Sequence, residues 1–101
     1  MAVIINGTTP TIQYTFKDVE VANISEAYLT IVANGQVVME KDLNTATVGD
    51  DYLAWTLTQQ ETLNMTSTAY MMLNWLLVDG TRGASSKTTV LMDTNFKNEV
   101  I

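Results

Sequence analysis

The sequence predicts an all-β sandwich, in which two sheets pack face to face, built from about seven short strands and one short helical turn. Three observations lead to this fold class. Apolar and polar residues alternate along Thr11–Phe16, which is typical of a strand with one buried face. The dipeptide Asn34-Gly35 separates two apolar runs, a strong hairpin signal. The predicted strands recur at the 8–12-residue spacing of sandwiches, and no long amphipathic helical pattern is present.

The first quarter of the chain predicts two strands and a polar loop. Val3–Ile5 forms a short first strand, and the turn Asn6–Pro10 leads into the alternating strand Thr11–Phe16. Lys17–Ser25 is then a polar loop. Its apolar residues are expected to anchor it to the core: Val19, Val21 and Ile24.

A hairpin is predicted next, with strands Ala27–Ala33 and Val37–Asp42. Its turn Asn34-Gly35 suits type I′ geometry, in which both central residues have positive φ. Alternation along the first strand places Leu29 and Ile31 toward the core.

The second half begins with a loop over Asn44–Asp51 and a strand over Tyr52–Leu57. Thr58–Met65 follows as one helical turn, because Thr58 and Glu61 have the spacing of a capping box. We expect this turn to cross from one sheet to the other before the strand Ala69–Val78.

The chain ends with the turn Asp79–Gly83, a last strand near Ser86–Asp93, and the tail Thr94–Ile101. The pattern leaves open whether this tail pairs within its own chain or with a neighbour. Without a linker, repeat or low-complexity block, residues 1–101 are interpreted as one domain.

The strand Ala69–Val78 departs from simple alternation. Met72 and Leu76 are apolar on the face that should be wet, and only Asn74 interrupts that face. One interpretation is that the tail covers this face with Phe96, Val100 and Ile101. The other is that Met72 and Leu76 lie in a protein–protein interface. Arg82, expected at a loop tip, is a further interface candidate.

The composition of the chain limits the kinds of partner that we expect. The 101 residues carry a formal net charge of −6 and contain no histidine and no cysteine. Nucleic acids and anionic membrane surfaces attract basic proteins, so neither is an expected partner. The amino-terminal segment is too short for a signal peptide and no apolar stretch approaches ~20 residues, so we expect a soluble protein made in the cytoplasm.

Acidic residues give no convincing catalytic or metal site. Asp50-Asp51, with Asp42 and Glu40 nearby in sequence, does not follow the spacing of a calcium loop. Glu26, Glu40 and Glu61 would have to meet in pairs to act as a glycosidase, and nothing in the sequence brings them together. We therefore expect neither enzymatic activity nor a cofactor.

The aromatic residues divide into two registers. Tyr14, Trp55 and Trp75 fall on the predicted core faces. Tyr28, Tyr52 and Tyr70 fall on the opposite faces and are candidates for stacking against a sugar.

In the order of its motifs, the chain resembles small immunoglobulin-like β-sandwich proteins of phage and prophage virion and tail modules, and the amino-terminal domain of phage baseplate upper proteins. The motifs that carry the resemblance are Asn6-Gly7-Thr8-Thr9-Pro10, Leu29-Thr30-Ile31 before Asn34-Gly35, Leu57-Thr58-Gln59-Gln60-Glu61-Thr62-Leu63, Asn74-Trp75-Leu76 before Asp79-Gly80, Gly83-Ala84-Ser85, and Glu99-Val100-Ile101. Members of that group carry more charge where this chain has Met72 and Leu76.

The resemblance implies an immunoglobulin-like fold and a non-enzymatic structural or assembly role in the tail or baseplate of a tailed bacteriophage or prophage. It implies no catalytic residues. The partners would be other virion proteins or further copies of this chain, and the protein would be made in the bacterial host cytoplasm and built into the virion. The alternative is a host-surface carbohydrate-binding module that uses Tyr28, Tyr52 and Tyr70.

Overall fold

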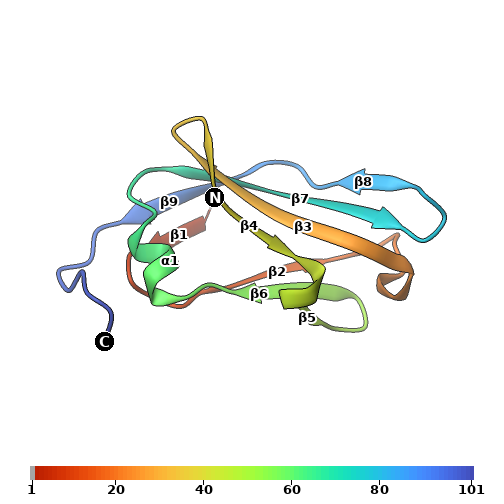
Figure 1. Ribbon diagram of the computed structural model, residues 1–101, viewed down its shortest axis with the longest axis horizontal. Coiled ribbons are helices and arrows are strands. Elements are labelled where there is room, and N and C mark those ends of the chain that lie inside the picture. The colour runs from red at the N-terminus through yellow and green to blue at the C-terminus, as the bar shows by residue number, and fades with distance from the viewer. Residues whose placement is uncertain (1) are drawn as a thin grey trace.

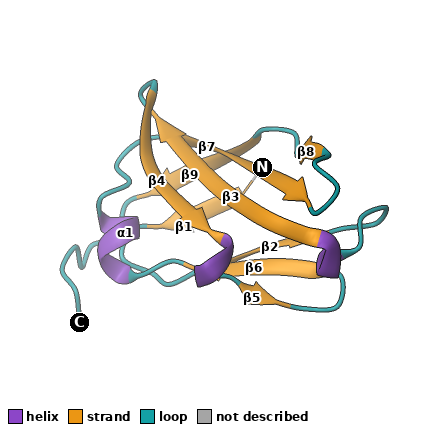
Figure 2. Cartoon of the chain, turned by 45° about the vertical axis from the view of Figure 1, so that its right-hand side comes forward, coloured by secondary structure: helices purple, strands orange, loops and turns teal. Residues whose placement is uncertain are grey.

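The computed structural model describes residues 2–101, which form a sandwich of two β-sheets (Figures 1 and 2). Nine strands are present in the described residues, with one short α-helix and two 3-10 turns. The elements are β1 (Ala2–Ile5), β2 (Thr11–Thr15), η1 (Val21–Asn23), β3 (Ile24–Ala33), β4 (Gln36–Asp42), η2 (Leu43–Thr45), β5 (Thr47–Val48), β6 (Tyr52–Thr56), α1 (Gln59–Leu63), β7 (Ala69–Leu77), β8 (Arg82–Ala84) and β9 (Thr88–Asp93).

The two sheets differ in size. The larger has the order β1-β9-β7-β3-β4, and β8 pairs with the end of β7 to make a six-stranded sheet. The smaller has three strands in the order β2-β6-β5. All neighbours are antiparallel except β1, which runs parallel to β9. The predicted immunoglobulin-like all-β class is therefore confirmed.

The strand count and several boundaries differ from the prediction of about seven strands. η2 begins at Leu43 and extends into the predicted loop Asn44–Asp51, and the two-residue strand β5 lies within that loop. The predicted turn Asp79–Gly83 contains the start of β8, and β3 begins three residues earlier than expected, at Ile24. Strands as short as β5 and β8 depend on pairing with a neighbour and leave little local pattern in the sequence.

The β3–β4 hairpin has the predicted turn. Asn34 and Gly35 have φ values of 54° and 75°, so both central residues adopt the left-handed conformation that a type I′ turn requires. Leu29 and Ile31 point into the core, as predicted, and are 4% and 0% exposed.

The core lies between the two sheets. β3 and β7 are paired along almost their full lengths at the centre of the larger sheet, and their inward residues pack against β6. The predicted loop anchors Val21 and Ile24 are buried, and Val19 packs against the core. The fully buried large side chains are Ile31, Leu53, Leu57, Met65, Leu73, Val90 and Thr62.

The helix α1 forms the corner between the sheets, because it joins β6 of the smaller sheet to β7 of the larger one. Its predicted capping box is present: Glu61 N–H donates to Thr58 Oγ1, and Thr58 N–H donates to Glu61 Oε1. The buried Thr62 hydroxyl accepts from Gly7 N–H and donates to the Thr8 carbonyl. These bonds attach the corner to the β1–β2 turn.

The tail does not cover the outer side of β7. Phe96 and Ile101 are 107% and 88% exposed, and Val100 is also exposed. The tail runs past α1 instead, where the Gln59 side-chain amide exchanges two hydrogen bonds with the Ile101 backbone. The interpretation in which the tail buries Met72 and Leu76 is therefore wrong. Among the helices of residues 2–101, none is both long and apolar enough to cross a membrane.

Candidate interaction surface

The side of the six-stranded sheet that faces away from the core carries an unusual set of side chains, and we call it the outer face. Alternation along β3 and β7 places every second residue there. The outer face consists of Glu26, Tyr28, Thr30 and Val32 on β3, Tyr70, Met72, Asn74 and Leu76 on β7, Val37, Glu40 and Asp42 on β4, Arg82 and Ala84 on β8, Leu91 on β9, and Val3 on β1.

Apolar side chains dominate the middle of this face. Met72 and Leu76 are half-buried by their strand neighbours, while Tyr28 and Tyr70 are 38% and 46% exposed. Val37 on the adjoining strand is 61% exposed. We call Tyr70, Met72 and Leu76 the apolar stripe, and nothing in the described residues covers it. Contiguous exposed apolar area on a soluble protein usually marks an interaction site.

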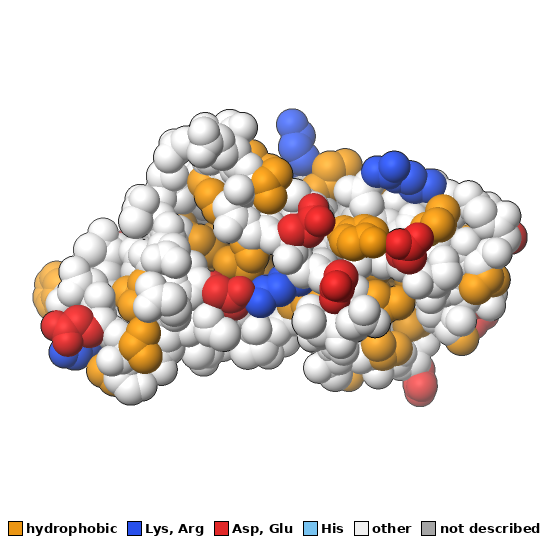
Figure 3. Space-filling view, in the orientation of Figure 1, with side chains coloured by type: hydrophobic (Ala, Val, Ile, Leu, Met, Phe, Trp, Pro, Cys, Tyr) orange, Lys and Arg blue, Asp and Glu red, His pale blue; other side chains and the backbone are white. Residues whose placement is uncertain are grey.

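Charged residues are sorted to the two sides of the stripe. The carboxylates of Glu26, Glu40 and Asp42 lie on β3 and β4, and Arg82 lies on β8 at the other side. Lys87, in the β8–β9 connection, borders the same hollow as Met72. In Figure 3, basic groups project at the upper margin and acidic groups lie among hydrophobic ones below them, while further basic groups lie beside acidic ones near the centre and at the lower left.

Arg82 is not at a loop tip, which corrects the prediction. It is the first residue of β8 and pairs in register with Leu76, which in turn pairs with Glu26 on β3. Its Nη2 donates to Asn74 Oδ1 at 3.1 Å, which holds the guanidinium over β7. The sequence did not predict a strand at Arg82 because Gly83, a poor strand former, lies in the middle of β8. That glycine is needed because a Cβ there would lie 2.4 Å from the Trp75 ring.

Two shallow hollows in the outer face meet at Asn74. One, of about 220 Å³, is bordered by Glu26, Tyr28, Leu76 and Arg82. The other, of about 350 Å³, is bordered chiefly by apolar groups and by Lys87. Tyr28 Oη donates to Glu26 Oε1 at 2.9 Å, and this bond, with the negative charge of Glu26, raises the pKa of Tyr28. Tyr28 therefore stays neutral at physiological pH.

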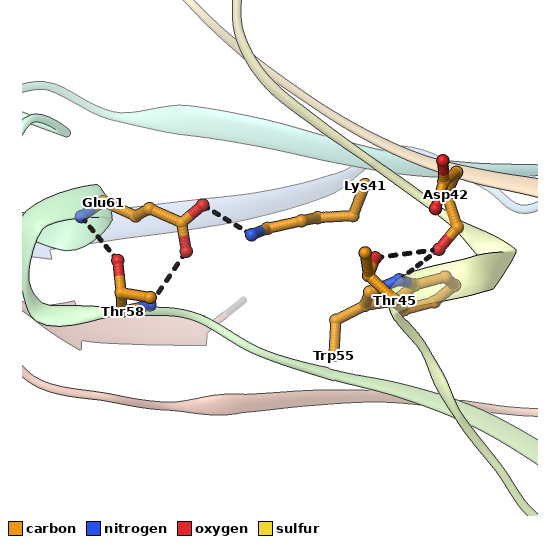
Figure 4. A network of polar contacts seen from close by, with 6 residues as sticks. All are labelled: Lys41, Asp42, Thr45, Trp55, Thr58 and Glu61. Carbon is orange, nitrogen blue, oxygen red and sulfur yellow. Dashed lines mark hydrogen bonds and ion pairs between the residues drawn. The ribbon is translucent and has the colours of Figure 1, made fainter.

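The acidic side of the face is fixed in place by contacts from β4 to the rest of the sandwich (Figure 4). Lys41 forms an ion pair with Glu61 on α1, and the Asp42 carbonyl accepts from Trp55 Nε1 and Thr45 Oγ1. Burial by itself would raise the pKa of Glu61, but Lys41 and the hydrogen bonds from Thr58 hold that pKa below its usual value.

The three candidate sugar-stacking tyrosines are not brought together. Tyr28 and Tyr70 share the outer face, but they are separated by four residues along β7, or about 13 Å. Tyr52 lies on β6 in the other sheet, with its ring against Gly49. Trp55 is buried as predicted, whereas Tyr14 and Trp75 are only partly buried and stack with Phe16 at the sandwich edge.

The candidate catalytic and metal residues also remain apart. Glu61 is engaged by the capping box and Lys41, while Glu26 and Glu40 border the apolar stripe from different strands. Across residues 2–101 no group of three histidine, cysteine or acidic residues is arranged to hold a metal ion.

Comparisons with known proteins support the fold alone. No protein-family model matches the chain, and no curated protein matches it. Among solved structures, the chain is similar to CopC from Methylosinus trichosporium OB3b, with a TM-score of 0.57 and 14% identity over 92% of this chain and 83% of that one. It is also similar to part of a 1.5-MDa bacterial ice-binding adhesin, with a TM-score of 0.53 and 17% identity over 93% of this chain and 28% of that one.

Proposed function

We propose that this protein is a non-enzymatic structural protein of a tailed bacteriophage or prophage particle, located in the tail or baseplate, and that it contacts its neighbours through the outer face. The observation that carries the proposal is the uncovered apolar stripe of Tyr70, Met72 and Leu76 between charged margins. An apolar centre with a polar rim is the general composition of protein–protein interfaces.

The remainder of the molecule suits a scaffold. The two sheets share one core, and α1 and β4 lock the corner between them, so the outer face is presented on a rigid support. The assignment to a phage particle rests on the resemblance of the chain's motif order to that of small immunoglobulin-like virion and tail proteins. In this role, specificity comes from the shape of the face and the placement of its charges.

Purified particles from a bacterium that carries the gene test the proposal. We expect the protein to copurify with particles through a density gradient and to be found in tail fractions by mass spectrometry. A protein that is expressed in the host yet absent from washed, infectious particles would contradict the proposal.

Carbohydrate binding is the second candidate, because the 220 Å³ hollow combines the exposed Tyr28 ring with the polar groups of Glu26, Asn74 and Arg82. An aromatic face with nearby carboxylate, amide and guanidinium groups offers both stacking and hydrogen bonds to a sugar. Titration with cell-wall saccharides, followed by NMR shifts of the Tyr28 and Asn74 signals, tests it. Unchanged spectra at millimolar saccharide would exclude this candidate.

A further inference from the structure

We propose that the outer face binds a second copy of this chain, with the two faces stacked about a two-fold axis parallel to β7. The inference rests on the proposed function in one respect: it takes the outer face as the contact surface and identifies the partner. The argument comes from the register of β3, β7 and β8 and from the placement of charge on either side of β7.

In every register row of the outer face, the residue on β7 is uncharged. In one row Leu76 lies between Glu26 on β3 and Arg82 on β8. In the next row Asn74 lies between Tyr28 and Ala84. β7 is therefore the midline of the face, with neighbouring strands ~4.8 Å to each side.

A two-fold axis along this midline, in the plane between the stacked faces, exchanges the two sides. Glu26 of each copy then faces Arg82 of the other, so that one dimer contains two such pairs. The bulky Tyr28 ring faces the small Ala84, and Leu76 meets Leu76 on the axis. An axis perpendicular to the strands would instead place carboxylates over carboxylates.

The other charged residues follow the same division. Glu40 lies on the β4 side, and Lys87 lies in the β8–β9 connection, where it borders the same hollow as Met72. The same rotation brings the acidic margin of one copy toward the basic margin of the other. Arg82 has no ion-pair partner among residues 2–101, and its contact with Asn74 leaves the guanidinium available for an oncoming carboxylate. The face is thus self-complementary in charge.

The size of the face suits a dimer of modest affinity. β7 has nine residues, or about 30 Å, and four strands span about 19 Å, so each copy buries on the order of 550 Å². The total of about 1,100 Å² is near the lower limit for specific interfaces. We therefore expect a reversible equilibrium between monomer and dimer.

Light scattering after size-exclusion chromatography, over a hundredfold range of concentration, measures this equilibrium. We expect Arg82→Glu and Glu26→Arg each to raise the dimer dissociation constant by at least about tenfold, because each places two like-charge pairs in the interface. The double variant Glu26→Arg with Arg82→Glu restores the opposite charges, so it should recover the wild-type dissociation constant within a few-fold.

Matched controls separate the specific pair from general charge effects. Lys97→Glu and Glu99→Arg make the same changes in net charge on the exposed tail, away from the outer face, and should leave the dissociation constant unchanged. Circular dichroism checks that every variant is folded. Leu76→Asp should abolish the dimer, because it places two carboxylates against each other on the two-fold axis.

Two results would overturn the inference: a wild-type monomer at every concentration up to millimolar, or a dimer in which the double variant is no better than the single ones. Neither result would decide whether the protein is a particle component, because that is measured by its presence in purified particles. Conversely, a rescued dimer from a protein absent from particles would retain this inference and reject the phage role.

Discussion

The two solvent-facing surfaces of the sandwich differ sharply in character. The side of the three-stranded sheet that faces away from the core carries Thr11, Gln13 and Thr15 from β2 opposite Thr56, Ala54 and Tyr52 from β6, and of these only Ala54 is buried. The outer face of the six-stranded sheet instead carries Tyr70, Met72 and Leu76 along β7. An antiparallel sheet with one wet side normally shows the first pattern.

This contrast teaches that the apolar outer face is not required by the fold. Both sheets contribute to the same core, and both have a side turned to solvent. The smaller sheet shows that this sandwich tolerates a polar surface rich in threonine. The apolar residues on β7 therefore need an explanation outside the folding of the single chain, and an interface provides one.

The largest expected effect comes from substitutions on the two sides of β7. Leu73→Ala should lower the free energy of unfolding by about 2–5 kcal/mol, because Leu73 is 2% exposed and its loss leaves a cavity. Leu76→Ala, three residues away, should cost only about 1 kcal/mol or less in the monomer. Urea unfolding of dilute protein measures both. Equal losses in the free energy of unfolding would contradict the comparison, because they would show that Leu76 is packed as tightly as a core residue.

Gly83→Ala should have the next largest effect, because it tests how the edge of the outer face is built. The new methyl group would meet the Trp75 ring, which packs against Phe16 at 5.1 Å between centroids. We expect a loss of about 1–3 kcal/mol and a shift in tryptophan fluorescence. Ala84→Ser, an exposed neighbour, should change stability by less than about 0.5 kcal/mol. An unchanged emission spectrum for Gly83→Ala would contradict this account of β8.

Glu61→Gln should have the smallest effect, and it separates charge that serves the fold from charge on the outer face. The lowered pKa of Glu61 means that its ionised form stabilises the folded state at neutral pH. That contribution is lost as the pH falls through the folded-state pKa. The variant should be less stable by under about 1 kcal/mol at pH 7, and its stability should fall less between pH 6 and pH 3 than that of the wild type.

Thermal unfolding of both proteins as a function of pH gives this comparison. Glu99→Gln is the control, because its ion pair with Lys97 is exposed on the tail. An identical pH dependence for the wild type and Glu61→Gln would show that the Lys41 pair contributes nothing measurable.

Local sequence signals predicted much of the fold. Asn34-Gly35 specified its turn because few other residue pairs adopt two positive φ values, and Thr58 with Glu61 specified the start of α1 because the capping box is a contact within four residues. Alternation likewise identified the core side of β3. These features depend on neighbours in sequence, so they can be recognised without the tertiary structure.

What escaped prediction depends on contacts between distant segments. β8 pairs with the end of β7, where the Trp75 ring leaves no room for a side chain at Gly83, and the order of strands decides that Tyr28 and Tyr70 share a face while Tyr52 does not. The anomaly at Met72 and Leu76 was visible in the sequence. The position of Arg82 in the same register row as Leu76 and Glu26 was not, because only strand pairing creates that row.

The pairing of β1 with β9 has a consequence for how the chain reaches its final state. β1 lies at the edge of the larger sheet and pairs there with β9, and Asn95 donates to the Asn6 carbonyl across 89 residues of sequence. The first strand therefore cannot pair until residues 88–93, which form β9, have been synthesised. Such non-local closure is slow, and it leaves hydrophobic segments available for premature association. The strong negative charge of the chain opposes that association by mutual repulsion between nascent copies.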